Sequence, residues 1–223
     1  MNKKEIAGYR ACEYIKDGMI VGLGTGSTAY YMVERLGQLV KEGLHIKAVA
    51  TSNATENQAK SLHIELLDIE QINTLDLAID GVDEIDSSFN AIKGGGGALF
   101  REKVVASLAK EVIWIMDDSK QVEAIGDFPL PIEVVVYGYK QLLHKFTKMK
   151  LNPVLRLKDG KPFITDNKNY IIDLHLKAPL DIKKLKGLKN LLGVVETGLF
   201  LNMCDRIIVG SDKAFVFENE NKK

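Results

Sequence analysis

The sequence has few cysteines and no long apolar run, and both absences restrict where the protein can work. Cys12 and Cys204 are the only cysteines, so there is neither a C-x-x-C motif nor a disulfide framework, as is typical of a reducing compartment. No uncharged apolar stretch approaches the roughly 18 residues that a membrane-spanning helix needs. The first segment, MNKKEIAGYRACEYIKDG, has charges throughout its apolar pattern, unlike a signal peptide. We therefore expect a soluble cytoplasmic protein with no membrane partner.

Excess charge and metal-binding motifs are also absent. Lys+Arg and Asp+Glu balance at 30 each, whereas nucleic-acid-binding proteins normally carry a basic face. The basic run Lys183–Lys189 is interpreted as the solvated face of an amphipathic helix. We therefore expect no nucleic-acid partner. The histidines form neither an HxxxH nor an HExxH pattern, so no metal is expected; they are His45, His63, His144 and His175.

The first part of the chain alternates between apolar strands and amphipathic helices. This alternation predicts a parallel sheet covered by helices on both faces, a Rossmann-like α/β domain formed by residues 1–128 and 201–223. Its predicted helices span residues 3–16, 27–41 and 98–109, and its strands span 19–23, 46–50, 64–67, 75–79 and 111–116. The segment DRIIVGSDKAFVFE is predicted to return to this domain as a hairpin.

The pattern changes after residue 128, where FPLPIEVVVYG brings two prolines and a β-branched run. A helix is predicted at 139–149, a second at 181–191 and a strand at 194–200, with two or three strands between the helices. This β-α-β-β-α-β order is the split βαβ arrangement of ferredoxin-like domains. We therefore expect a smaller α+β domain over residues 129–200.

Polar or glycine-rich loops follow the strands of the first domain. Ligands of open parallel sheets bind at the edge where the carboxyl ends of the strands meet, so several such loops together indicate a pocket. The loops are GTGST, TSNAT, DGVDEID, KGGGG and DDSK.

The loop GLGTGST is consistent with an anion site or with a tight strand-to-helix turn. Gly24, Gly26 and Ala29 satisfy GxGxxA, but the next strand ends in Ala50-Thr51 and not in the acidic residue that a dinucleotide site requires. The chain also lacks GK[ST], which excludes a P-loop. In the anion reading, hydroxyls and the free N–H groups of a helix N-terminus bind a phosphate.

The acidic cluster DGVDEID leaves three interpretations open. It is consistent with a solvated turn, with a metal site, or with carboxylates that accept hydrogen bonds from sugar hydroxyls. Its spacing is not that of an EF-hand loop.

The stretch KGGGGALFREK combines a lysine, four glycines and a glutamate. Four consecutive glycines are tolerated where backbone must lie against a ligand. Lys93 and the glycine amides are suited to hold a developing oxyanion, and Glu102 is suited to move a proton. The alternative is that Glu102 is an ordinary surface partner of Arg101 and Lys103.

In their order, GTGST, DGVDE, KGGGGAL-x-REK, the SK of DDSKQV and FPLP-x-EV resemble ribose-5-phosphate isomerase of type A. The similarity runs nearly end to end, and Val82, where alanine is common, is a small departure. The resemblance implies interconversion of ribose 5-phosphate and ribulose 5-phosphate in the pentose phosphate pathway. It also implies a metal-independent reaction without a cofactor, and a homodimer.

The resemblance further implies roles for single residues. Glu102 matches the catalytic acid–base, and Asp80, Asp83 and Lys93 match residues around the reacting end of the sugar. The implied substrate-binding residues are Thr25, Gly26, Ser27, Thr28, Asp80, Gly81, Val82, Asp83, Lys93, Gly94, Gly95, Gly96, Lys120 and Lys4. Two other functions were weighed: an amino-sugar phosphate deaminase, which shares the anion loop, and a sugar-phosphate sensor, which has no need of Glu102.

Overall fold

The computed structural model describes residues 2–222, and these form two compact units. The first unit comprises the residues up to Val82, Arg101–Lys120 and the residues from Asn202 onwards. The second comprises Asp83–Phe100 and Gln121–Leu201. The predicted division at residue 128 stays a prediction. Within residues 2–222, no helix combines the length and the apolarity needed to cross a bilayer.

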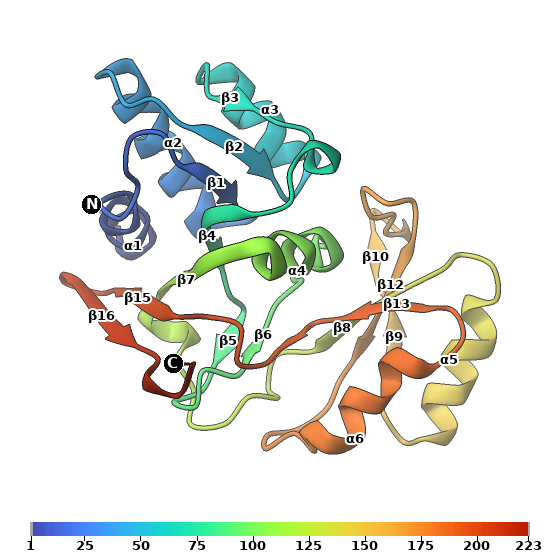
Figure 1. Ribbon diagram of the computed structural model, residues 1–223. Helices are drawn as coiled ribbons and strands as arrows, with labels where there is room; N and C mark the ends of the chain where they lie inside the picture. The colour runs from blue at the N-terminus through green and yellow to red at the C-terminus, as the bar shows by residue number, and fades with distance from the viewer. Residues whose placement is uncertain (1, 223) are drawn as a thin grey trace. The chain divides into compact units, whose positions relative to one another are not determined.

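The first unit is built on a seven-stranded sheet in the order β16-β15-β7-β4-β1-β2-β3 (Figure 1). All neighbouring strands are parallel except β15 and β16, which form the predicted hairpin. This is the order of a doubly wound nucleotide-binding sheet with an antiparallel edge strand. Its strands are β1 (Ile20–Leu23), β2 (Lys47–Ala50), β3 (Glu65–Leu66), β4 (Leu75–Gly81), β7 (Ala109–Asp117), β15 (Arg206–Gly210) and β16 (Ala214–Glu218).

Helices cover both faces of this sheet, as the sequence predicts. Buried residues of α1 (Lys3–Cys12) and α2 (Ser27–Lys41) pack with Val21, Leu77 and Ile79 in one core. The opposite face is covered by α4 (Leu99–Leu108). Gly22 of β1 faces this side, since its neighbour Val21 faces the first core, and a Cβ added to Gly22 would lie 2.4 Å from a methyl carbon of Val105 in α4. The remaining helical segments are α3 (Asn53–Ser61), η1 (Ile69–Gln71), η2 (Asp118–Lys120) and η4 (Glu220–Lys222).

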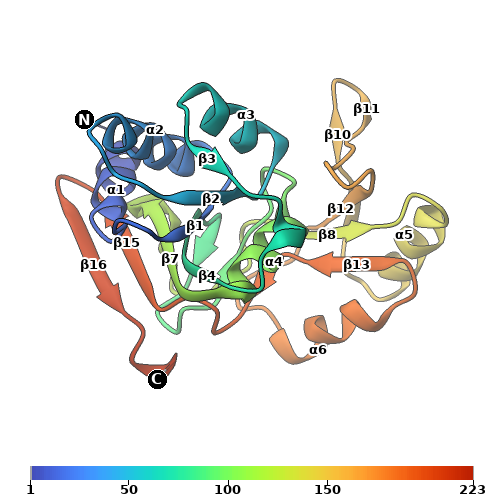
Figure 2. The same ribbon diagram turned by 45° about the horizontal axis from the view of Figure 1, so that its top comes forward.

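The second unit contains the predicted β-α-β-β-α-β domain. Its four-stranded sheet has the order β13-β8-β12-β9, with every neighbouring pair antiparallel. Residues of α5 and α6 form a core with one face of this sheet, and the hairpin β10–β11 extends away from it (Figure 2). The elements are β8 (Leu130–Val134), α5 (Tyr139–Lys148), β9 (Pro153–Leu155), β10 (Leu157–Lys158), β11 (Lys161–Pro162), β12 (Tyr170–Leu174), α6 (Ile182–Lys186), η3 (Gly187–Asn190) and β13 (Val194–Thr197).

Three predicted elements differ from the structure. The helix predicted at 3–16 ends at Cys12, and the helix predicted at 181–191 divides into α6 and η3. The strand predicted at 194–200 is interrupted at Gly198, whose N–H donates to the carbonyl of Pro131 and whose carbonyl accepts from Lys93. After this interruption β14 (Leu199–Phe200) pairs with β6 (Ala91–Ile92), which pairs with β5 (Glu84–Ile85). Such two-residue strands are too short to produce a periodic signal.

Candidate functional site

The strands β1, β2, β4 and β7 end at one edge of the seven-stranded sheet. Leu23 lies beside Ala50 on one side and Ile79 on the other, and β7 continues the parallel register from β4. Four of the five predicted loops therefore meet at this carboxyl edge. They are residues 24–28, 51–55, 80–82 and 117–120. The fifth loop, KGGGG, belongs to the second unit.

Asp80, at the end of β4, is buried against the turn that follows β1. Its Oδ1 accepts hydrogen bonds from the N–H groups of Thr25 (2.9 Å) and Gly81 (2.7 Å). A Cβ at Gly24 would lie only 2.1 Å from this same oxygen. Position 24 must therefore be a glycine, because any larger side chain would collide with the carboxylate of Asp80. The residues around Gly24 in the sequence do not reveal this contact. Val82 follows as a buried residue.

Thr25 connects the first loop to the second through its hydroxyl group. Its Oγ1 lies 2.7 Å from the Oγ1 of Thr51 and 2.8 Å from the Oγ of Ser52. Thr55 donates from its own hydroxyl to the carbonyl of Gly24 at 2.9 Å. The Thr25 side chain thus contributes to the shape of the edge, and its predicted contact with a substrate stays a prediction.

The start of α2 has the features of an anion site. Gly26 precedes the helix with a φ of 108°, a conformation that favours glycine, and no side chain caps the helix. The first N–H groups of α2 therefore have no partner within the helix. The ammonium group of Lys4, from α1, lies 2.8 Å from the Oγ of Ser27, and Thr28 is buried beside it in the chain. A cation, hydroxyls and helix N–H groups together favour a phosphate.

Lys120 lies on the same edge of the sheet. It ends η2, the short turn that follows β7, and it is half-buried. Because β4 separates β7 from β1, Lys120 is two strands away from the start of α2.

Glu102 is buried in the first turn of α4, with 4% of its surface exposed. The interpretation of Glu102 as a surface partner of Arg101 and Lys103 is therefore wrong. Arg101 donates to the Oδ1 of Asn53, at the start of α3, with a distance of 3.0 Å. This bond places the N-terminus of α4 at the carboxyl edge of the sheet.

Glu102 and Asp80 lie on the same face of that sheet. Val105 packs over Gly22, whose added Cβ would also lie 3.2 Å from the Cβ of Ala78. Ala78 and Asp80 share a face of β4, because side chains alternate along a strand. Glu102 lies one helical turn before Val105, about 4.5 Å nearer the carboxyl edge at 1.5 Å per residue. The fold therefore places both carboxylates on the same face of the sheet, near its carboxyl edge.

The second unit holds the remaining predicted residues, and Asp83 contacts the glycine loop that follows β6. The Oδ2 of Asp83 accepts from the N–H of Gly95 at 2.7 Å. Lys93 is buried, 1% exposed, and its ammonium group lies 5.3 Å from the centre of the Phe200 ring. Gly95 and Gly96 form an exposed crest, whereas Gly94 is buried. The crest thus presents backbone amides beside a carboxylate and a lysine.

The other two acids of DGVDEID have structural partners. Glu84 accepts hydrogen bonds from the N–H groups of Gly126 and Phe128 at 2.8 and 2.6 Å. Asp86 accepts from the backbone of Ser88 and Asn90, as in a local turn. Among residues 2–222, no three His, Cys, Asp or Glu side chains come together as metal ligands would. Sugar binding by Asp80 and Asp83 stays a prediction.

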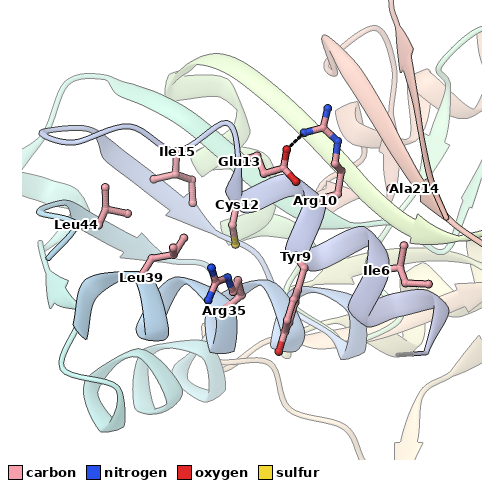
Figure 3. Close-up of a pocket in the computed structure, with 10 residues that line it drawn as sticks. All are labelled: Ile6, Tyr9, Arg10, Cys12, Glu13, Ile15, Arg35, Leu39, Leu44 and Ala214. Carbon is pink, nitrogen blue, oxygen red and sulfur yellow. Dashed lines mark hydrogen bonds and ion pairs between the residues drawn. The ribbon is translucent and has the colours of Figure 1, made fainter. Parts of the chain in front are cut away.

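A separate pocket lies in the first unit, lined mainly by residues of α1 and α2 (Figure 3). It has a volume of about 560 Å³, and Cys12 lies in it, with burial raising the pKa of this thiol to about 12. Arg10 and Glu13 form an ion pair at its rim. It contains none of the predicted site residues; it is lined by Ile6, Tyr9, Arg10, Cys12, Glu13, Ile15, Arg35, Leu39, Leu44 and Ala214.

The sequence interpretation missed residues that shape the site without belonging to a recognisable motif. Thr51, Ser52 and Thr55 belong to the predicted polar loop TSNAT but are not predicted as site residues, yet their hydroxyls hold Thr25 and Gly24. Arg101 fixes the start of the helix that carries Glu102. The only available signal was the clustering of hydroxyl residues after a strand.

Comparison with known proteins identifies one family. The family model for ribose 5-phosphate isomerase A (phosphoriboisomerase A) matches residues 47–214. Ribose-5-phosphate isomerase A of Streptococcus pneumoniae is 49% identical over 225 residues, covering 100% of this chain and 99% of the relative.

Solved structures lead to the same family. Ribose 5-phosphate isomerase from Plasmodium falciparum superposes with a TM-score of 0.92 at 36% identity, over 97% of this chain and 98% of the other. A D-ribose-5-phosphate isomerase in complex with phospho-erythronic acid superposes with a TM-score of 0.93 at 34% identity, over 98% and 100% of the two chains. The fold, the order of the motifs and these similarities place the chain in the ribose 5-phosphate isomerase A family.

Proposed function

We propose that this chain interconverts ribose 5-phosphate and ribulose 5-phosphate through an enediol, with Glu102 as the acid–base. The observation that supports this most directly is the position of Glu102. It is buried at the start of α4, on the same face and edge of the sheet as Asp80. A carboxylate beside hydrogen-bonding groups, in a chain of this family, is suited to transfer a proton between adjacent carbons.

Different groups of the site have different roles in the reaction. Lys4, Ser27, Thr28 and the N–H groups of α2 bind the phosphate, with Lys120 as a second cation. The carboxylates of Asp80 and Asp83 accept hydrogen bonds from sugar hydroxyls and assist ring opening.

Proton transfer then follows on the open-chain sugar. Glu102 takes the proton from carbon 2 of the aldose, and the electron pair forms the enediol double bond as the carbonyl oxygen becomes an oxyanion. Lys93 and the N–H groups of Gly94 and Gly96 stabilise that oxyanion. The hydroxyl proton at carbon 2 passes to the oxygen at carbon 1, and carbon 2 becomes the ketone as the electron pair of the double bond takes the proton that Glu102 returns to carbon 1.

The relative that holds phospho-erythronic acid supports this substrate class. Phospho-erythronic acid pairs a phosphate with a carboxylate, and a carboxylate resembles the oxygen arrangement of an enediolate. A protein complementary to the transition state binds such a compound well.

An isomerase assay in deuterated water tests the proposal against a deaminase and a sensor. We expect turnover of ribose 5-phosphate with deuterium incorporated at the exchanging carbon and without release of ammonia. We expect the same rate in EDTA, because the roles above need no metal. Binding of the sugar without turnover would favour a sensor, and a rate lost in EDTA and restored by Mg²⁺ would make DGVDEID a metal site.

A homodimer and a cytoplasmic location, both implied by the resemblance, belong to the same proposal. Light scattering of the purified protein should give twice the mass of the 24.8 kDa chain. A monomeric mass would contradict the dimer without affecting the assignment of the reaction.

The phosphate assignment predicts a defect in binding for Lys120→Ala. We expect KM for ribose 5-phosphate to rise about tenfold or more, because the phosphate does not react and its binding energy is largely uniform along the reaction. A smaller loss in kcat is expected, since remote binding also orients the sugar. Steady-state kinetics measures both constants.

Lys110→Ala is the matched control for Lys120→Ala. Lys110 lies at the opposite end of β7, exposed and paired with Asp76 at 2.8 Å. Its loss removes the same charge and should leave KM unchanged. An unchanged KM in Lys120→Ala would remove Lys120 from the phosphate site.

A further inference from the structure

Arg156 holds the glycine loop from the side opposite Asp83. Its Nη1 donates to the carbonyl of Gly94 at 2.8 Å and to the carbonyl of Gly95 at 3.1 Å. Arg156 follows β9, about sixty residues after the loop in the chain. No motif in the sequence connects the two.

A carboxylate fixes the guanidinium group of Arg156 in this position. Its Nε and Nη2 donate to the two oxygens of Asp173, on β12, at 2.8 and 2.5 Å. Both side chains are largely buried, with 15% and 14% exposed. Such a bidentate pair has a defined geometry, and it leaves Nη1 directed at the loop.

The backbone around Arg156 is equally constrained. Its N–H donates to the carbonyl of Ile171, and its carbonyl accepts from the N–H of Phe163, both at 2.9 Å. The Phe163 ring lies 5.9 Å from the guanidinium carbon. A Cβ at Gly97 would lie 2.4 Å from this ring. The last glycine of the loop therefore packs closely against Phe163.

Because peptide bonds are planar, fixing the carbonyl groups of the loop also fixes the direction of the N–H groups on its exposed side. In a trans peptide the C=O of one residue and the N–H of the next point in opposite directions. With the Gly94 carbonyl directed at Arg156, the N–H of Gly95 points away from it, and this N–H meets Asp83 at 2.7 Å. The Gly95 carbonyl also points at Arg156, so the N–H of Gly96, in the same peptide group, points away from Arg156. The Gly95 N–H thus holds the carboxylate of Asp83, and the Gly96 N–H is one of the donors assigned above to the oxyanion.

We propose that the Arg156–Asp173 pair is a positioning element of the isomerase, which fixes the Gly95 amide against Asp83 and directs the Gly96 amide so that it stabilises the enediolate. Arg156 does not touch the substrate in this proposal. It acts through the glycine loop, and the inference rests on the site assignment under the proposed function. Glycine needs such support, because a run of four glycines has the largest backbone freedom to lose.

The test is Arg156→Met, which keeps a long apolar side chain and removes every donor. We expect kcat to fall about tenfold to a hundredfold, because misplaced donors weaken stabilisation of the transition state. KM for ribose 5-phosphate should change less than about threefold, because the phosphate groups are untouched. Inhibition by phospho-erythronic acid should weaken by about the same factor as kcat, while inhibition by inorganic phosphate should not change.

Arg206→Met is the matched control for stability. Arg206 is also paired with carboxylates, those of Glu111 and Glu218, and is 17% exposed, but it lies in the first unit, whereas the glycine loop lies in the second. It should lower the melting temperature comparably and leave kcat near that of the wild type. An equal loss of kcat in both variants, or a wild-type kcat in Arg156→Met, would overturn the proposal.

Two further variants keep the test decisive. If Arg156→Met does not fold, Arg156→Lys retains one charge but cannot bridge Asp173 and two carbonyls, so kcat should still fall. Asp173→Asn should lower kcat in the same direction, and adding it to Arg156→Met should have little further effect, because the pair acts as a unit. Failure of the site assignment can be distinguished from failure of this proposal. It would appear as activity retained in Glu102→Gln, independently of the result for the Arg156 variants.

Discussion

Replacing Glu102 with glutamine should lower kcat at least about a hundredfold, with little change in KM. Glutamine keeps the size of the side chain and most of its hydrogen bonding, but it cannot accept the proton. General acid–base catalysis contributes about 10²–10⁴-fold, or about 3–5 kcal/mol of activation free energy. KM should hold because Lys4, Lys120 and the start of α2 still bind the phosphate. Steady-state kinetics with ribose 5-phosphate measures both constants.

The neighbouring Lys103→Ala serves as the control for this variant. Lys103 lies on the same turn of α4 and is half-buried, so it reports any general effect of altering the helix start. It should lower kcat far less. If Glu102→Gln kept more than about a tenth of kcat while Asp80→Asn or Asp83→Asn abolished it, the base would belong to the acidic cluster.

Gly24→Ala should lower kcat/KM strongly by displacing the carboxylate of Asp80. The new Cβ would lie 2.1 Å from the Oδ1 and 2.5 Å from the Cα of Asp80, so the carboxylate and its strand must move. Overpacking of this kind destabilises a protein by about 1–3 kcal/mol. Because a displacement of about 1 Å can reduce a rate about a hundredfold, we expect kcat/KM to fall by that order. Chemical denaturation and kinetics on the folded variant separate the two effects.

Gly37→Ala provides the matched comparison for Gly24→Ala. Gly37 lies in the later half of α2, and its added Cβ would lie 2.8 Å from the side chain of Leu62. This variant should lose stability but keep kcat/KM. Should Gly24→Ala behave like Gly37→Ala, the position of Asp80 would not control the reaction.

Much of this architecture is encoded locally and was predicted from the sequence. The apolar stripe of α2 gave its bounds, Ser27–Lys41, as the structure has them. The alternation of strands and helices predicted the parallel sheet, and the order β-α-β-β-α-β predicted the sheet of the second unit. These signals depend on residues two to four positions apart, which elementary helix and strand geometry relates directly.

The family could also be identified from the sequence, because its motifs are short, uncommon and ordered. GTGST, DGVDE and KGGGGAL-x-REK each keep their chemistry within a few consecutive residues. Glu102 was selected in this way, although its spacing alone was equally consistent with a surface residue.

Only the tertiary structure decided what each of these residues contacts. Gly24 makes room for Asp80, Thr25 binds the hydroxyls of the second loop, and Glu84 holds a distant loop backbone. Arg156 and Asp173 have no motif, yet they hold the glycine loop. The physical reason is that such contacts join residues far apart in the chain, so they depend on strand register and packing. Local periodicity predicts which face a side chain occupies, but the partner that it meets there is set by the rest of the fold.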